Sequence, residues 1–201
     1  MTPVLLIAAY LLGSIPTSYI VARAARGIDL RQHGSGNLGA TNTYRVLGWR
    51  AAAPVFVLDI AKGWFPTAMF PLWDERASAH WALAYGAAAI VGHVYSVFVG
   101  FRGGKGVATS AGVLLALAPL AMLIGLLAWS LVLYLTGYVS LGSITAALIV
   151  PVVVLAQRGN GPLFWLCLAL ASFIVWAHRA NIRRLRDGTE NRFGKRRQEA
   201  A

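Results

Sequence analysis

Long apolar segments follow one another along almost the whole chain, and this feature limits the fold more than any other. Polar segments that carry most of the Lys and Arg lie between several of them and after the last. A transmembrane helix needs about 20 largely apolar residues, so each long segment predicts a membrane span. The chain is therefore expected to be all-α, a polytopic integral membrane protein with a single domain over residues 1–201 and a basic tail from about 179. The expected spans are residues 4–22, 53–72, 80–100, 107–118, 119–137, 140–157 and 162–178.

The composition excludes several other classes of protein. Apolar residues make up 58% of the chain and charged residues 12%, whereas soluble domains average about 45–50% and about 25%. A disordered chain would be poor in apolar residues. The single Cys167 excludes a disulfide framework and a cysteine-based zinc site. The net charge of +11 does not indicate nucleic-acid binding, because the cations lie between apolar segments rather than along one polar face.

The distribution of Lys and Arg indicates the orientation in the membrane. No cation precedes Arg23, so the N-terminus lacks the basic start of a signal peptide. The N-terminus is expected outside and the segment after the first span in the cytoplasm. A cytoplasmic C-terminus then puts 15 of the 18 cations inside, which the same rule favours. The other three are Arg76 and Arg158, expected outside, and Lys62, within a span.

The number of spans depends on residues 107–137. This segment could be one long helix or two short helices divided at Pro119, where proline would break or kink a helix. One helix gives six spans and leaves the basic tail outside, whereas two helices give seven spans and a cytoplasmic tail. We therefore predict seven spans. The 107–118 helix would rise only about 18 Å, so it would have to begin in the polar loop, stay at the interface or pack against protein.

The first candidate site lies in the polar segment 23–52. Three glycines within six positions would let backbone N–H groups approach an anion closely. Neutral hydrogen-bond donors and an arginine, whose planar fork suits phosphate, accompany them. A flexible glycine-rich loop with an exposed arginine is the alternative interpretation. The residues concerned are Gly34, Ser35, Gly36, Asn37, Gly39, Thr41, Asn42 and Arg45.

The second candidate site is a glycine-rich segment around Lys105, at the expected start of a helix. Helix N-termini attract anions through free N–H groups and the helix dipole. The spacing differs from a Walker A loop, because three rather than four residues separate Gly100 from Gly104, and Gly106 follows the lysine. Anion binding is favoured here, and a loop that only sets the membrane topology is the alternative.

The third candidate site is at the cytoplasmic end of the last span. His178 and Asn181 would share a face if the helix continues beyond the membrane, because positions i and i+3 are neighbours. An interfacial histidine without a function is an equally good interpretation. The arginines behind it could be topology signals or contacts to anionic lipids.

Several polar residues lie within or near the expected spans. Asp59 and Lys62 are three positions apart, and an ionisable residue in a span is a functional hypothesis with its partner named. A structural ion pair between the two is at least as good an explanation. Two hydroxyls near the expected cytoplasmic end of the 140–157 span could hydrogen-bond helices together or bind substrate. His93 and Tyr95 could likewise be structural or functional. The two hydroxyls belong to Ser140 and Ser143.

The sequence lacks the patterns of several other chemistries. There is no HEXXH motif, no zinc-type spacing of Cys or His, no pair of carboxylates for one cleft and no His-x4-Asp motif. We therefore expect no metal and no cofactor. Two other functions remain open, a transporter of phosphorylated metabolites and a scaffold for anionic lipid. A transporter would show repeats and sites at the midplane, and a scaffold would not need the polar residues of the first candidate site.

Three motifs together resemble one known family. GSGNLGATNTYR (34–45), GHVYSVFVGFRGGKGVAT (92–109) and HRANIRRLRDGTE (178–190) are similar to the three cytoplasmic motifs of the bacterial acyl-phosphate:glycerol-3-phosphate acyltransferases, the PlsY family. GSIPTSYIVAR (13–23) resembles the opening of that family, and the similarity runs from residue 4 to 190. The resemblance implies a seven-span enzyme of the bacterial inner membrane with its active site at the cytoplasmic face.

The resemblance also implies the reaction and its partners. A fatty acyl group would move from acyl phosphate to the sn-1 hydroxyl of glycerol 3-phosphate, which gives lysophosphatidic acid and phosphate for phospholipid synthesis. A substrate phosphate oxygen would take the hydroxyl proton, and orientation and charge stabilisation would supply most of the rate. The expected partners are the two substrates and the bilayer, with functional coupling to an enzyme that makes acyl phosphate.

The resemblance assigns roles to particular residues. The 103–106 loop would bind glycerol 3-phosphate, and Glu190 would be structural. The catalytic residues would be Ser35, Arg45, Lys105, His178 and Asn181. The substrate- and phosphate-binding residues would be Gly34, Gly36, Asn37, Thr41, Asn42, Gly103, Gly104, Gly106 and Ser143.

Overall fold

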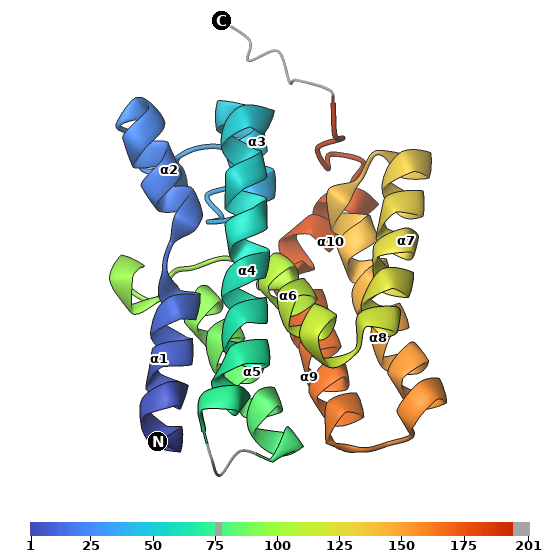
Figure 1. The fold of residues 1–201 in the computed structure, drawn as a ribbon. Coiled ribbons are helices and arrows are strands. Elements are labelled where there is room, and N and C mark those ends of the chain that lie inside the picture. The colour runs from blue at the N-terminus through green and yellow to red at the C-terminus, as the bar shows by residue number, and fades with distance from the viewer. Residues whose placement is uncertain (75–77, 195–201) are drawn as a thin grey trace, which may run out of the picture. The chain divides into compact units, whose positions relative to one another are not determined.

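The structure is a computed structural model that describes residues 1–74 and 78–194, and in this part of the chain all regular structure is helical (Figure 1). The helices pack into two compact units, Met1–Pro119 and Leu120–Ala201. The first unit contains α1 (Thr2–Ser14), α2 (Thr17–Arg26), η1 (Leu30–Gln32), α3 (Ala40–Leu47), α4 (Trp49–Trp73), α5 (Ala79–Val94), η2 (Val97–Val99) and α6 (Val107–Leu117). The second contains α7 (Pro119–Thr136, its first residue in the first unit), α8 (Val139–Arg158), α9 (Pro162–Ala177) and α10 (Arg179–Arg186).

Six of the seven expected spans correspond to one α-helix each and the first to two, α1 and α2, and the all-α integral membrane class is supported. Among the described residues, five helical segments are long and apolar enough to cross a membrane, and the bent pair α9–α10 makes up to six. The short helix α6 has 11 residues and rises about 16 Å, well below a bilayer core of about 30 Å. Seven crossings and the orientation of the termini therefore remain predictions. The five segments are Thr2–Arg26, Trp49–Trp73, His80–Val99, Pro119–Thr136 and Val139–Arg158.

The predicted division at Pro119 is confirmed. Helix α6 ends at Leu117, and Ala118 leaves the helical region with φ −148° and ψ 66°. Proline disfavours helical backbone in the residue before it and suits the first position of a new helix, which is where α7 begins.

Helix α6 packs against protein, which is one of the ways a helix this short could be accommodated. It lies on α4 at very close range, because a Cβ on Gly63 would collide with the Thr109 carbonyl and a Cβ on Gly112 with the Ile60 carbonyl. Small residues permit this kind of backbone contact between membrane helices.

The first span is broken, although the sequence predicted one continuous helix over 4–22. Helix α1 ends at Ser14, Ile15 has ψ 114°, and α2 begins at Thr17. Pro16 accounts for the break, since it has no N–H and disfavours helical backbone at the preceding residue. Helix α4 runs beside both α1 and α2 (Figure 1).

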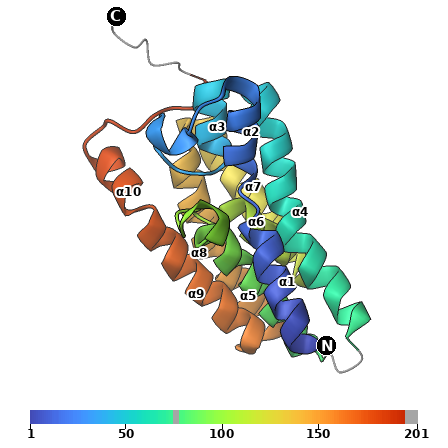
Figure 2. The same cartoon turned by 90° about the vertical axis from the view of Figure 1, so that its left-hand side faces the viewer.

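The polar segment 23–52 is more ordered than the sequence indicated. It contains the turn η1 and the helix α3, which packs beside α2 and α4 (Figures 1 and 2). Within the span expected at 80–100, helix α5 ends at Val94, and the 3₁₀ turn η2 follows at Val97–Val99.

In the second unit, α8 packs on α9, and α10 contacts both. The last helix does not continue straight past the expected membrane end, because α9 and α10 meet at a 54° bend at His178. The condition under which His178 and Asn181 would share a helix face, a helix that continues beyond the membrane, is therefore not met. Two sets of cations that supported the topology, Arg76 and residues 195–197, lie outside the described residues.

Candidate functional site

The first glycine-rich segment is a compact loop folded around Asn42. Gly34 and Gly36 have φ of 62° and 70°, in the left-handed region that glycine allows. The buried Asn42 amide accepts a hydrogen bond from the Ser35 N–H at 2.8 Å and donates one to the His33 carbonyl at 3.0 Å. Both polar ends of Asn42 thus hold the loop, which is a structural role. The phosphate-binding role assigned to it from the sequence stays a prediction.

An ion pair anchors this loop at its start. Arg31 contacts Asp29 at 2.7 Å, donates to the Val99 carbonyl at 3.2 Å and lies over the ring of Tyr19. The hydrogen bond from Arg31 lowers the pKa of Asp29 to about 2. Leu30 and Leu38 are buried with Ala22 and Val99. Sequence reasoning had counted Arg31 only as a topology signal.

Helix α3 carries two of the side chains of this segment that suit phosphate, Thr41 and Arg45. Gly39 precedes the helix in an extended conformation. Thr41 and Arg45 are four positions apart, so they lie on one face of α3, and both are half-buried. Ser35 is exposed and is tied to α3 through Asn42.

The second glycine-rich segment lies directly against the end of α5. The Gly103 N–H donates to the Val94 carbonyl at 2.9 Å, and the Gly104 N–H donates to the His93 carbonyl at 3.1 Å. A Cβ on Gly103 would collide with the His93 carbonyl, and a Cβ on Gly104 would collide with the His93 ring and the Leu38 carbonyl. The contact between Gly104 and Leu38 brings the first and second glycine-rich loops together.

Lys105 stands at the start of α6. Gly106 is the residue before the helix and has φ 80°. The half-buried Lys105 thus adds a positive charge beside the N-terminus of α6, which itself favours anions. No group of three metal-ligating side chains occurs among residues 1–74 and 78–194.

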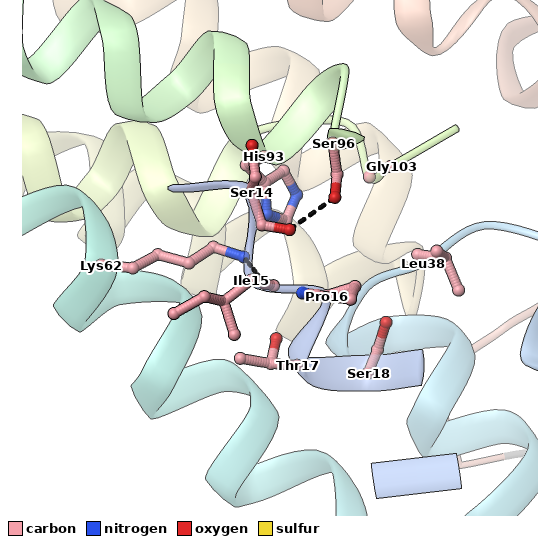
Figure 3. Close-up of a pocket in the computed structure, with 11 residues that line it drawn as sticks. Ser14, Ile15, Pro16, Thr17, Ser18, Leu38, Lys62, His93, Ser96 and Gly103 are labelled. Carbon is pink, nitrogen blue, oxygen red and sulfur yellow. Dashed lines mark hydrogen bonds between the residues drawn. The ribbon is translucent and has the colours of Figure 1, made fainter. Parts of the chain in front are cut away.

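A small pocket lies beside the two loops (Figure 3). Its wall includes four hydroxyl-bearing residues to which sequence reasoning assigned no role. The sequence pattern that could have indicated Ser14, Thr17 and Ser18 is their position around Pro16 inside an apolar segment. The pocket residues are Ser14, Ile15, Pro16, Thr17, Ser18, Leu38, Lys62, His93, Ser96, Gly103 and Gly104.

Asp59 and Lys62, the two ionisable residues within the expected span 53–72, pair with each other, as one of the two interpretations of the sequence expected. Lys62 Nζ lies 2.8 Å from Asp59 Oδ1, and both side chains are buried. Thr17 also donates to Asp59, at 2.6 Å, and the Lys62 ammonium donates to the Ile15 carbonyl at 2.9 Å.

The third motif forms a hydrogen-bonded cluster in the second unit. The buried Glu190 carboxylate accepts from Ser140 at 2.9 Å, Asn181 at 2.8 Å and Arg184 at 2.6 Å. Burial alone would raise the pKa of Glu190, but these hydrogen bonds outweigh burial and hold the pKa below its ordinary value. Glu190 thereby joins α8 to α10, which agrees with a structural role.

Two other predicted residues of the second unit have defined contacts. His178 is buried, and its Nδ1 lies 2.8 Å from the Ile174 carbonyl, which requires a proton on Nδ1 and puts the lone pair of the neutral ring on Nε2. Ser143 is buried, donates to the Val139 carbonyl at 2.9 Å and accepts from Trp129 at 3.3 Å. These contacts give Ser143 a place in helix packing, and its role in substrate binding stays a prediction.

Comparison with known proteins identifies the family. The family model for glycerol-3-phosphate acyltransferase matches residues 3–188. Curated glycerol-3-phosphate acyltransferases are similar over nearly the whole length of both chains. That of Geobacter metallireducens is 51% identical over 94% of this chain and 96% of its own. That of Halalkalibacterium halodurans is 46% identical over 96% of each chain.

Solved structures agree with the sequence comparison. The glycerol 3-phosphate form of PlsY (YgiH), an integral membrane glycerol 3-phosphate acyltransferase, matches with a TM-score of 0.89 and 39% identity over 96% of each chain. Its lysophosphatidic acid form matches with a TM-score of 0.86 and 38% identity over 96% of this chain and 95% of its own. The chain is therefore an integral membrane enzyme that belongs to the glycerol-3-phosphate acyltransferase family.

Proposed function

We propose that this enzyme uses acyl phosphate as its donor and acylates the sn-1 hydroxyl of glycerol 3-phosphate, at the cytoplasmic face of the bacterial inner membrane. The observation that carries the proposal is the contact between the two glycine-rich loops, Gly104 on Leu38, because a reaction between two phosphate-bearing substrates needs two neighbouring anion sites. The similar PlsY structures in glycerol 3-phosphate and lysophosphatidic acid forms support the acceptor and the product.

The 103–106 loop binds the phosphate of glycerol 3-phosphate. Gly103 and Gly104 let the loop pack closely on the end of α5, and Gly106 lets the chain turn into α6. The Lys105 ammonium is a compact charge on a flexible stem and neutralises the phosphate dianion.

The 34–45 loop binds the phosphate of the donor. Ser35 and Arg45 are the essential side chains, and Arg45 offers phosphate two parallel N–H donors. The backbone N–H of Gly34, the turn at Gly36 and the side chains of Asn37 and Thr41 complete this site. Asn42 keeps the loop folded through its bonds to Ser35 and His33.

The reaction is an acyl transfer. The sn-1 oxygen attacks the carbonyl carbon of acyl phosphate, the bond between that carbon and the phosphate oxygen breaks, and inorganic phosphate leaves. The hydroxyl proton passes to a phosphate oxygen of a substrate. Acyl phosphate is a mixed anhydride with a good leaving group, so orientation and charge stabilisation suffice for most of the rate. His178 and Asn181 contribute to activity, and Glu190 holds Asn181 in place.

The proposed topology has seven crossings, with the N-terminus outside and the C-terminus in the cytoplasm. It is supported by the division of 107–137 into α6 and α7 and by the basic residues of the expected cytoplasmic segments. The donor is a reactive anhydride, which favours functional coupling to the enzyme that produces it.

The proposal is tested with purified protein, acyl phosphate and sn-glycerol 3-phosphate. Lysophosphatidic acid and inorganic phosphate are expected in a 1:1 ratio, and an acyl thioester offered at the same concentration should give no product. Phosphate release without lysophosphatidic acid, or equal rates with the thioester, would refute the proposed reaction. Arg45→Ala should abolish product formation, whereas Arg50→Ala, at an exposed position next to the same loop, should not.

A further inference from the structure

A buried polar cluster lies between the break in the first span and the 103–106 loop. It consists of Thr17, Asp59, Lys62 and His93, which we call the Asp59 cluster, and it joins three segments of the first unit: α2, α4 and α5. Figure 3 shows that Lys62 and His93 both lie at the Ile15–Pro16 break.

Asp59 is the centre of this cluster. Its Oδ1 accepts from Thr17 at 2.6 Å, lies 2.8 Å from Lys62 Nζ and lies 3.7 Å from His93 Nδ1. All four side chains are buried. Ionisable groups inside a membrane protein are costly, and a buried ion pair adds little to stability compared with apolar packing. The cluster therefore calls for an explanation other than stability.

His93 connects the cluster to the acceptor loop. Its carbonyl accepts from the Gly104 N–H at 3.1 Å, and its ring fills the space where a Gly104 side chain would lie. A shift of the His93 ring or backbone would thus move Gly104, which also rests on Leu38.

Lys62 of this cluster also contacts the other wall of the pocket, as does Ser96. Lys62 donates to the Ile15 carbonyl at 2.9 Å, and the Ser96 hydroxyl donates to the Ser14 carbonyl. The break at Pro16 is thereby held by α4 and by the segment after α5. Ser14 Oγ and His93 Nδ1 are buried, have no hydrogen-bond partner among the described residues and belong to residues that line the pocket.

We infer that Asp59, with Thr17 and Lys62, positions His93 and through it the Gly103–Gly104 backbone, and so sets the affinity for the acceptor phosphate. These are positioning residues, because they act on the substrate only through the loop. The inference rests on the proposed function, in which the 103–106 loop binds glycerol 3-phosphate.

The test compares two variants that each remove one hydroxyl from a buried carboxylate of the first unit. Thr17→Val removes a donor to Asp59. Tyr85→Phe removes a donor to Asp74, which accepts from Tyr85 at 2.7 Å and also from Thr2. Asp74 directly follows the last residue of α4. Tyr85→Phe is thus a matched control without contact to the loop. We expect Thr17→Val to raise the KM for glycerol 3-phosphate roughly fivefold or more and to leave the KM for acyl phosphate within about twofold.

Tyr85→Phe should leave both KM values within about twofold of the wild-type values, although both variants lower the melting temperature in detergent. Thr17→Ser retains the donor and should restore both constants. Asp59→Asn should show the same split as Thr17→Val, and a larger one. Unchanged KM values in Thr17→Val or Asp59→Asn, or equal changes for both substrates, would overturn the positioning role. A wild-type protein without transferase activity would instead refute the proposed function, and binding of glycerol 3-phosphate measured by calorimetry would still separate Thr17→Val from Tyr85→Phe.

Discussion

The Gly104 N–H donates to the His93 carbonyl at 3.1 Å, and the ring of His93 occupies the space that any side chain at Gly104 would need. This contact seats the acceptor loop on the end of α5. It also explains why glycine is needed at 104 even though the backbone there is not left-handed.

Gly104→Ala should inactivate the enzyme without unfolding it. The added methyl would collide with His93 and with the Leu38 carbonyl, so the loop must shift. A displacement of about 1 Å can cost roughly 100-fold in rate. Steady-state kinetics measure this as a fall in kcat/KM for glycerol 3-phosphate. Gly161→Ala, where a methyl meets nothing within 4 Å, is the control and should retain wild-type kinetics; equal activity of the two variants would contradict the close packing.

Lys105→Ala should weaken acceptor binding selectively. Loss of a charge-assisted hydrogen bond to phosphate raises the KM for glycerol 3-phosphate by about 10- to 100-fold. The KM for acyl phosphate should change far less. Arg102→Ala, which removes an exposed cation three residues earlier, is the control for a general loss of positive charge. A parallel rise in both constants in Lys105→Ala would count against assigning this loop to the acceptor.

Glu190 should make the stability of the protein sensitive to acid. Its pKa is lowered in the folded state by hydrogen bonds that outweigh burial. The stability it contributes is therefore fully present above the ordinary pKa of 4.5 and is lost as the pH falls through the lower folded value. At neutral pH, Glu190→Gln should lower the free energy of unfolding by about 1–3 kcal/mol.

The melting temperature in detergent, followed against pH, tests this contribution. The difference in melting temperature between wild type and Glu190→Gln should be constant near neutral pH and should shrink below pH 4.5. Asp187→Asn, at an exposed position on the same segment, should melt like the wild type at neutral pH. A difference between wild type and Glu190→Gln that grows on acidification would show that the carboxylate is not stabilised in the folded state.

The seven-span topology predicts that residues 50 and 189 lie on the same side of the membrane. Six crossings separate these positions if α6 and α7 both span, and five if they form one span. Single cysteines at the exposed positions Arg50 and Thr189, in a Cys167→Ser background, should both label from the cytoplasmic side with an impermeant reagent. A cysteine at Asn160 should label from outside. Labelling of 50 and 189 from opposite sides would rule out seven crossings.

The features that could be predicted from the sequence depend on residues that are close together in the chain. Apolar length located every long helix, and Pro119 marked the division between α6 and α7 because proline acts on its immediate neighbours. The motif glycines indicated loops with close backbone approach, which Gly103 and Gly104 show. The same proline rule applied at Pro16, but an apolar segment of full span length concealed it.

The remaining features depend on partners distant in the sequence. Lys62 supports the break at Ile15 from 47 positions away, and Asn42 became a structural residue because the His33 carbonyl and the Ser35 N–H converge on it. The helix bends at His178. Beyond the bend, the Glu190 carboxylate accepts hydrogen bonds from Asn181 and Arg184 of α10. No periodicity in the sequence encodes these contacts.

The proposed function depends on acyl transfer from acyl phosphate, with attack at the carbonyl carbon. The most direct measurement uses acyl phosphate that carries ¹⁸O in the oxygen bridging carbon and phosphorus, with sn-glycerol 3-phosphate as acceptor. Mass spectrometry of the products should find the label in inorganic phosphate and none in lysophosphatidic acid, because the carbon–oxygen bond breaks. Unlabelled phosphate, with ¹⁸O retained in the fatty acid, would mean that the phosphorus–oxygen bond breaks and would contradict the account.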